Sequence, residues 1–312
     1  MFKIESKDYY VITPMNEEYR CSLRGKLKKE FEFKGNKLTA VDIVTVGDNV
    51  EFDLNRDGSG VITHIEKRSN YISRKAPKIK GAGIRGERLE QIVAANFNNL
   101  VIVSSAASPK FNNKLIDRLI VAGESSHVDV TIVVNKIDLD ESVHKSYVQL
   151  YRRIGYQVFE TSVKKEIEIE ELRYHLQGKI NLFWGQSGVG KSSLLNLLFP
   201  GLKLKIGEIS DYTSKGKHTT VTVLLKKVDA NTIVIDTPGI REIDPYGITK
   251  HDLGHYFKDF SQYITKCKFN TCTHHHEPGC GVIKAVEEGG INVERYESYL
   301  KILDTIEEDL FF

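Results

Sequence analysis

The stretch GQSGVGKS, from Gly185 to Ser192, has the residue types and spacing of a phosphate-binding loop. Two glycines, Gly185 and Gly190, allow tight turns that aim backbone N–H groups at phosphate oxygens, and the helix that follows adds its positive end. Lys191 is predicted to reach the β- and γ-phosphates and to act in catalysis, while the Ser192 hydroxyl binds Mg²⁺. The predicted phosphate contacts are Gly185, Gln186, Ser187, Gly188, Val189, Gly190, Lys191, Ser192 and Ser193.

The stretch NKID, from Asn135 to Asp138, indicates which base the nucleotide carries. The Asp138 carboxylate can accept hydrogen bonds from N1–H and the 2-amino group of guanine, and adenine offers no such pair of donors. Asn135 is expected to brace the neighbouring loops, and the aliphatic stem of Lys136 to cover the base. Four residues are a weak signal alone, but they follow the apolar run TIVV in a chain that also has a phosphate loop.

The third motif is DTPG, from Asp236 to Gly239, after the apolar run TIVI. Asp236 is predicted to hold Mg²⁺ through water, and the Gly239 N–H to meet the γ-phosphate. A turn with Asp and Pro-Gly is common by itself. Its position after the phosphate loop, with GKHTT between them, is typical of a GTPase switch region.

Catalysis requires a group that positions water, and Ile240 stands where a glutamine often follows the DxxG motif. We hypothesise that His218 of GKHTT positions or deprotonates the attacking water, because a neutral imidazole accepts a proton near neutral pH. The alternative is that His218 is a surface residue that contacts RNA. Thr219 or Thr220 is expected to complete the Mg²⁺ coordination, and we assign Thr220.

The motifs occur in the order base-reading, phosphate loop, magnesium aspartate. An ordinary GTPase cut before its fourth strand, with its old ends joined at Gln177-Gly178, has this order, and such a permutation is tolerated where chain ends lie close together on a surface. The apolar runs from Leu100 onward alternate with amphipathic helices, which predicts a mostly parallel α/β sheet covered on both faces.

The flanking regions have a different character. Short β-rich segments from Tyr9 to about Ile65, separated by polar turns, suit a small barrel that binds oligonucleotides. SNYISRKAPKIKGAGIRG, residues 69–86, is then expected to be a glycine-containing linker. Residues 67–88 hold eight Lys or Arg and one acid, which favours either an RNA contact or an ordinary solvated linker. After about Asp244, Tyr296 to Leu310 have the spacing of a helix with one apolar face.

Three of the four cysteines crowd between Cys267 and Cys280, which favours a metal site over disulfides. Cys267, Cys272 and Cys280, with a histidine of the run His274 to His276, form a set suitable for a structural, tetrahedral Zn²⁺. Sequence alone leaves the choice of histidine open, and packing of free cysteines is the alternative. Cys21 is interpreted as a packing residue only.

The chain resembles the circularly permuted GTPases of the RsgA family, also called YjeQ or YloQ, over nearly its whole length. The resemblance rests on VGDNV, QIVAANFNNLVIV, NKID, GQSGVGKSSLLN, GKHTT, DTPGIRE and CKFNTCTHHHEPGC. It implies an N-terminal OB-fold barrel, a circularly permuted P-loop GTPase domain and a C-terminal helical zinc-binding domain, here residues 1–80, 81–243 and 244–312. It selects His274 as the zinc ligand. Ser162 of ETSVKK matches the base-contacting loop, where Val163 replaces a usual alanine.

The resemblance further implies GTP hydrolysis stimulated by the small (30S) ribosomal subunit during late maturation, with contact to its 16S rRNA and GTP/GDP, Mg²⁺ and one Zn²⁺ bound. We expect a cytoplasmic monomer without membrane contact, since no apolar run spans a bilayer and the start lacks a signal-peptide core. Two other classes compete: a P-loop metabolic kinase, which has no use for NKID, and a zinc protein with an inert G domain, which does not explain intact Lys191 and Asp236.

Overall fold

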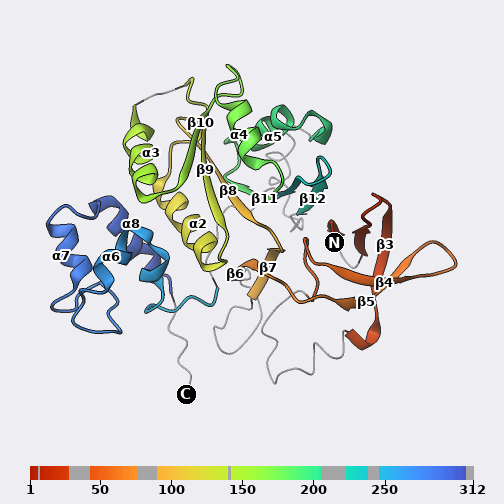
Figure 1. Ribbon diagram of the computed structural model, residues 1–312, viewed down its shortest axis with the longest axis horizontal. Helices are drawn as coiled ribbons and strands as arrows, with labels where there is room; N and C mark the ends of the chain where they lie inside the picture. The colour runs from red at the N-terminus through yellow and green to blue at the C-terminus, as the bar shows by residue number, and fades with distance from the viewer. Residues whose placement is uncertain are drawn as a thin grey trace, which may run out of the picture.

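The computed structural model describes residues 1–5, 8–27, 43–75, 90–139, 142–204, 223–237 and 246–306 of the chain. Within these ranges one large sheet runs through the molecule (Figure 1). Its strands are β1 (Lys3–Glu5), β2 (Asp8–Ile12), β3 (Glu18–Leu23), β4 (Val50–Leu54), β5 (Gly60–Ile65), β8 (Asn99–Ser105), β9 (Asp129–Asn135), β10 (Gln157–Thr161), β11 (Ile180–Gly185), β12 (Leu224–Lys227) and β13 (Ile233–Asp236). Their order across the sheet is β10-β9-β8-β11-β13-β12-β1-β2-β3-β5-β4.

The central part of the sheet is parallel, as predicted. Strands β10, β9, β8, β11 and β13 pair in parallel, and β12 adds an antiparallel strand beside β13. Strands β8 to β10 precede β11 in the chain, yet β8 lies directly between β9 and β11. The chain passes from α4 (Ile169–Leu176) to β11 within three residues, and Gly178 takes the left-handed conformation with φ of 70°. This arrangement is the predicted permuted order with its joint at Gln177-Gly178.

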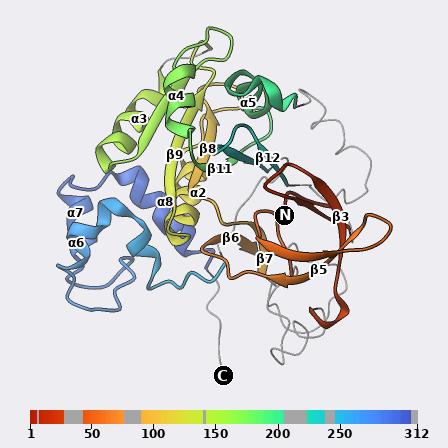
Figure 2. The same ribbon diagram turned by 45° about the vertical axis from the view of Figure 1, so that its right-hand side comes forward.

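Helices cover both faces of the parallel strands because alternate side chains of each strand point to opposite faces. Leu100 and Ile102 of β8 belong to one core with α2 (Asn113–Ser125) and α3 (Val143–Ile154). Val101 and Val103 of the same strand belong to a second core with α4 and α5 (Lys191–Leu198). The near-continuous apolar strands therefore pack against a layer of helices on each face of the sheet (Figures 1 and 2).

The N-terminal strands join the central sheet, a connection that the sequence did not predict. β1 pairs with β12, so β1 to β5 continue the central sheet. Their own small core contains Val11, Cys21 and Ile62, which confirms Cys21 as a packing residue. The expected linker begins with a strand, β6 (Tyr71–Lys75), which forms an antiparallel pair with β7 (Glu90–Ala95).

The C-terminal region packs as a third unit with a core of its own. It contains the short helical turns η3 (Leu253–Tyr256) and η4 (Lys258–Phe260), and the helices α6 (Ser261–Ile264), α7 (Gly281–Glu287) and α8 (Val293–Leu303). Helix η1 (Pro200–Leu202) belongs to the central part of the chain. Tyr299 and Leu303 of the predicted apolar face are buried, and α8 lies against α2 (Figure 2). The helix ends at Leu303, before Ile306 of the predicted face, and Leu310 lies outside the described residues.

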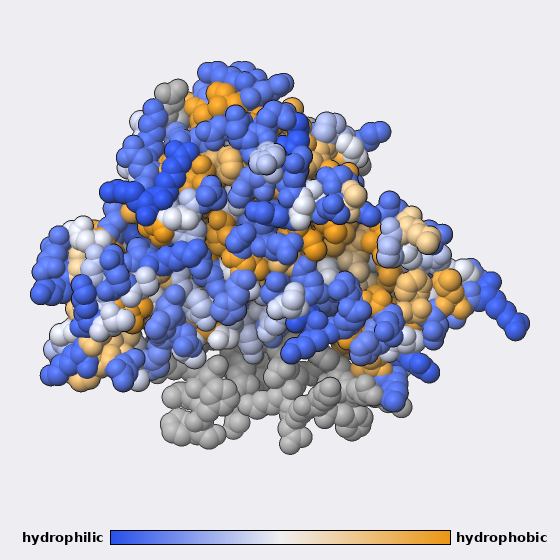
Figure 3. Space-filling model, viewed as in Figure 1, coloured by the Kyte–Doolittle hydropathy of each residue, from blue (hydrophilic) through white to orange (hydrophobic). Residues whose placement is uncertain are grey.

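Hydrophilic residues cover most of the face shown in Figure 3. Within the described ranges, no helix combines the length and the apolar composition that crossing a bilayer requires.

Candidate nucleotide site and metal cluster

The phosphate loop connects the end of β11 to the start of α5, as predicted. Gly188 and Gly190 have φ of 83° and 90°, a region in which side chains other than glycine are strained. A Cβ atom at Gly190 would also lie 2.5 Å from Nδ2 of Asn135. Glycine is therefore required at position 190 both by the turn and by the close approach of the NKID strand.

Asn135 ties the base-reading motif to the phosphate loop. It ends β9 and is buried, its Nδ2 donates to the Val189 carbonyl at 2.9 Å, and its Oδ1 accepts from the Thr161 hydroxyl at 3.2 Å. These bonds fix two loops that are far apart in the chain, and this is the bracing role predicted for the residue. Thr161 had no signal of its own in the sequence.

Lys136 makes contacts that the sequence did not indicate. Its Nζ donates to the carbonyls of Ser108 and Gly188, each at 2.6 Å, and its φ of 64° is left-handed. The ammonium group thus holds the phosphate loop and the loop after β8 together, while the stem of the side chain lies along them.

Asp138 of the NKID stretch lies in contact with Ser162. The Ser162 hydroxyl donates to Oδ1 of Asp138 at 2.6 Å and accepts from the Lys165 N–H at 3.1 Å. The hydrogen bond from Ser162 lowers the pKa of the Asp138 carboxyl, which favours its charged form. Val163 is partly buried against the second core, so the larger side chain at this position is accommodated by packing.

Lys191 and Asp236 form a buried ion pair between Nζ and Oδ1, and each residue is 7% exposed. Asp236 ends β13 directly beside Phe183 of β11, and Ser192 is the second residue of α5. The predicted phosphate-binding lysine and magnesium aspartate therefore meet at the edge of the sheet where the parallel strands end. His218, Thr219, Thr220 and Gly239 lie outside the described residues.

A separate cluster of possible metal ligands lies in the C-terminal region. The ligand atoms of Cys267, Cys272, His274 and Cys280 all lie within 4.8 Å of one another. Nδ1 of His274 lies 3.5 Å from Sγ of Cys267 and 3.4 Å from Sγ of Cys280. The structure brings together the four residues that the family pattern selects, and it leaves His275 and His276 exposed.

Backbone and side-chain contacts orient this cluster. The N–H groups of Gly281 and Ile283 donate to Sγ of Cys267 and Cys280 at 3.3 and 3.4 Å. Burial raises the pKa of the Cys272 and Cys280 thiols, so a bound cation would supply the charge that their thiolate forms require. On the other side of the ring, a Cβ atom at Gly254 would lie 2.8 Å from Nε2 of His274.

Glu277 shapes the loop that carries the histidine, a role that no sequence motif indicates. Its carboxylate accepts from the N–H and the hydroxyl of Thr273 at 2.7 and 2.6 Å, and from the N–H of His275 at 3.0 Å. A glutamate between three histidines and a proline carries no motif, so only the folded loop reveals this role.

Comparisons with known proteins agree with this geometry. The family model described as RsgA GTPase matches residues 65–246. A relative from Bacteroides thetaiotaomicron, named small ribosomal subunit biogenesis GTPase RsgA 2, is 38% identical over 96% of this chain and 94% of its own. The crystal structure of YjeQ from Thermotoga maritima superposes with a TM-score of 0.72 and 34% identity, covering 97% of this chain and 95% of that one. The structure of YloQ, described as a circularly permuted GTPase, gives 0.65 and 29%, with 97% and 92% covered.

Proposed function

The chain belongs to the RsgA GTPase family, and on that premise we propose that it hydrolyses GTP and assists the late maturation of the small (30S) ribosomal subunit. The observation that carries the proposal is the meeting of three motifs at one edge of the sheet. Asn135 bonds to the loop that holds Lys191, and Lys191 contacts Asp236, although the chain orders these residues unlike an ordinary GTPase.

The proposed GTP site uses Asp138 and Ser162 for guanine, and Lys191 with the backbone of the phosphate loop for the phosphates. Ser192 and Asp236 offer the hard oxygen ligands that Mg²⁺ prefers, and we assign Thr220 as the further ligand. Magnesium, when bound, would neutralise charge on the β- and γ-phosphates. The Lys191 ammonium then has to leave Asp236 and turn to the nucleotide, so nucleotide binding and the ion pair exclude each other.

The Cys/His cluster fits a structural zinc ion. Three thiols and one imidazole within 4.8 Å match the ligand types of closed zinc sites, and N–H groups already point at two of the sulfurs. We assign Zn²⁺ to Cys267, Cys272, His274 and Cys280. Its role would be to stabilise residues 246–306, since all four ligands come from the protein.

We assign the N-terminal strands as an OB-fold barrel that contacts 16S rRNA. The support is topological: the order β1-β2-β3-β5-β4 includes a parallel pair between β3 and β5. In OB folds the face of the second and third strands and the loop between the fourth and fifth bind oligonucleotides. Here the loop carries exposed Arg56, and the strand face carries exposed Arg20, which pairs with Asp8 at 2.8 Å. We keep the proposed domain boundaries at residues 1–80, 81–243 and 244–312, and propose a cytoplasmic monomer.

Hydrolysis is proposed to loosen the grip on the ribosomal subunit through the sheet. β12 follows the GKHTT segment closely, and it pairs with β13 on one side and with β1 on the other. The Leu225 N–H donates to the Phe2 carbonyl at 2.9 Å. A change in the switch segments thus has a short backbone path to the N-terminal strands. Affinity for the small subunit should differ between GDP and a non-hydrolysable GTP analogue, and equal affinities would remove this coupling.

The deciding experiment measures GTP hydrolysis by the purified chain alone and with small ribosomal subunits. We expect slow hydrolysis that the subunits accelerate. Transfer of phosphate to a metabolite would instead support a kinase, and GTP binding without hydrolysis in either condition would support an inert G domain. His218→Ala tests the proposed water-positioning residue: stimulated turnover should fall while GTP affinity persists, and unchanged turnover would remove the assignment.

A further inference from the structure

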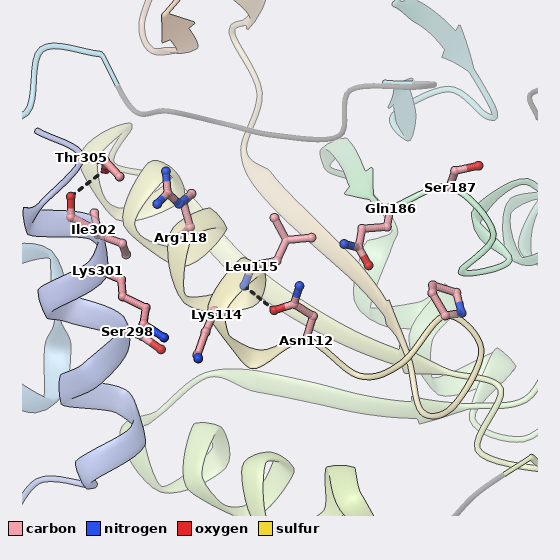
Figure 4. A pocket seen from close by; sticks show the side chains of 11 residues that line it. Asn112, Lys114, Leu115, Arg118, Gln186, Ser187, Ser298, Lys301, Ile302 and Thr305 are labelled. Carbon is pink, nitrogen blue, oxygen red and sulfur yellow. Dashed lines mark hydrogen bonds between the residues drawn. The ribbon is translucent and has the colours of Figure 1, made fainter. Parts of the chain in front are cut away.

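A cleft of about 790 Å³ lies between α2, α8 and the phosphate loop. Its lining residues come from these three segments or lie next to them in the chain, and the proposed function assigns no role to the space between them. In Figure 4 the side chains of α2 and α8 line one side of the cleft, and Gln186 and Ser187 of the phosphate loop line the opposite side. Asp138, Lys191, Ser192 and Asp236 are absent from its described lining, so the cleft adjoins the proposed GTP site without being built from its main ligands.

The charge of the cleft is one-sided. Lys114 and Arg118 of α2 and Lys301 of α8 line it, and no Asp or Glu occurs among its described lining residues. Lys114 and Lys301 lie between the two helices (Figure 4), and contact with the Lys114 ammonium lowers the pKa of Lys301, an effect that the Glu297 carboxylate opposes. Two cations held together in this way repel each other, and a bound anion would remove the repulsion.

A buried ion pair joins the same two helices. Nη1 of Arg295 in α8 donates to Oδ1 of Asp117 in α2 at 2.5 Å, and both side chains are 1% exposed. Lys114 precedes Asp117 in α2, and Lys301 follows Arg295 in α8. The repulsion between the lysines is therefore opposed by a fixed, buried contact, and the cleft is a built feature of the docked helices.

Polar groups suited to an anion complete the cleft. Asn112 uses its Oδ1 to accept from the Leu115 N–H at 3.1 Å, which leaves the Nδ2 amide as a donor at the same wall. The Ser187 side chain is exposed on the phosphate-loop side. Since a water molecule takes about 30 Å³ in the liquid, the cleft has room for a ligand much larger than one phosphate ion.

We propose that the α2–α8 cleft is a second phosphate-binding site, which takes a backbone phosphate and its neighbouring nucleotide from a single strand of RNA. The inference rests on the proposed function, which places the chain on a ribosomal subunit. Lys114 and Lys301 neutralise the phosphodiester, and the Asn112 amide donates to it. Because the cleft adjoins the phosphate loop, bound RNA lies beside the nucleotide that the loop holds.

The test uses the full chain and a short single-stranded RNA that contains 4-thiouridine. After photocrosslinking, crosslinked peptides are mapped in wild type, Lys114→Glu, Lys301→Glu, and the matched control Lys284→Glu, whose lysine lies exposed on α7. We expect crosslinks in α2 or α8 that either cleft variant removes and the control keeps. The slope of log affinity against log salt should fall by about 1 per lysine. If a Lys→Glu variant fails to fold, the neutral variant Lys114→Gln or Lys301→Gln replaces it. The neutral variants should also lose the crosslinks and lower the salt slope.

Two outcomes overturn the proposal. Absence of cleft crosslinks in wild type, or equal loss in the control, removes the RNA site. A second arm uses inorganic phosphate: if phosphate protects Lys114 and Lys301 from chemical acetylation and RNA does not, the cleft holds a free anion instead. Stimulation of GTP hydrolysis by small subunits is measured separately in wild type. Its absence would overturn the proposed function, whereas stimulation without cleft crosslinks would overturn this inference alone.

Discussion

Arg295 and Asp117 join the C-terminal region to the central sheet through one buried contact. Nη1 of Arg295 donates to Oδ1 of Asp117, which also accepts from the Tyr151 hydroxyl at 2.8 Å, while Nε of Arg295 donates to Asp259 at 3.2 Å. The Arg295 guanidinium lies 4.6 Å from the centre of the Phe257 ring. The two regions are thus docked by charge and packing together, so α8 and α2 are expected to move as one body.

Arg295→Met should weaken this docking strongly. Removing one partner of a buried ion pair costs about 3–5 kcal/mol, because Asp117 would stay buried without its counter-charge. Urea unfolding followed by hydrogen exchange in residues 246–306 measures the effect. The control Lys284→Met breaks an exposed pair with Glu288 and should change stability by less than about 1 kcal/mol. Equal effects of the two substitutions would contradict a structural role for Arg295.

Lys191→Met should destabilise the nucleotide-free protein as well as abolish tight GTP binding. It leaves the Asp236 carboxylate buried without a cation, at a cost of about 3 kcal/mol. Lys191→Met combined with Asp236→Asn should recover most of this stability without recovering GTP binding. The double-mutant cycle is measured by urea unfolding. Additive losses would show that the two side chains do not interact.

Asp138→Asn should change the preferred base of the bound nucleotide from guanine to xanthine. Xanthine has a carbonyl group where guanine has its 2-amino group, and the asparagine amide donates to that oxygen. Losing two hydrogen bonds to a charged acceptor should lower GDP affinity at least about 100-fold. Competition of GDP and xanthosine diphosphate against a fluorescent nucleotide reads the change. Unaltered preference for guanine would show that Asp138 does not read the base.

Ser162→Ala should raise the pH at which nucleotide binding is lost. The hydrogen bond from Ser162 lowers the pKa of the Asp138 carboxyl. The stabilising effect of this bond is present above the ordinary pKa of Asp, and it disappears as the pH falls through the lowered pKa of Asp138. Without this bond the pKa of Asp138 rises toward its ordinary value. GDP binding is then lost at a higher pH when the solution is acidified. GDP titrations across the acid range test this. Ser125→Ala, whose hydroxyl bonds only within α2 among the contacts described, should leave the acid limb in place.

Removing the proposed zinc ion should unfold the C-terminal region selectively. His274→Ala should lower the zinc content of the purified protein and the protection of residues 246–306 against hydrogen exchange, and a chelator should have the same effect on wild type. His275→Ala and His276→Ala are matched controls from the same run, and both side chains are exposed. Zinc loss in either control equal to that of His274→Ala would show that the wrong histidine had been assigned.

Local chemistry and periodicity predicted much of the fold. The apolar runs of β8, β9 and β11, the amphipathic helices between them, and the short joint at Gln177-Gly178 are confirmed, because each depends on residues close together in the chain. The strand β6 and the pairing of β1 with β12 were not predicted. Strand pairing joins distant segments, and no local pattern specifies the partner.

The sequence by itself determined which residues could do chemistry: a predicted phosphate loop at Gly185 to Ser192, an aspartate at Asp138 predicted to read guanine, and a cysteine-histidine set from Cys267 to Cys280. Tertiary structure decided which groups meet. It placed Nδ1 of His274 at the sulfurs, aimed the Lys136 ammonium at two carbonyls, and paired Arg295 with Asp117 across 178 positions of chain. Residue type and spacing fix what a side chain can do, whereas burial and long-range packing fix what it touches.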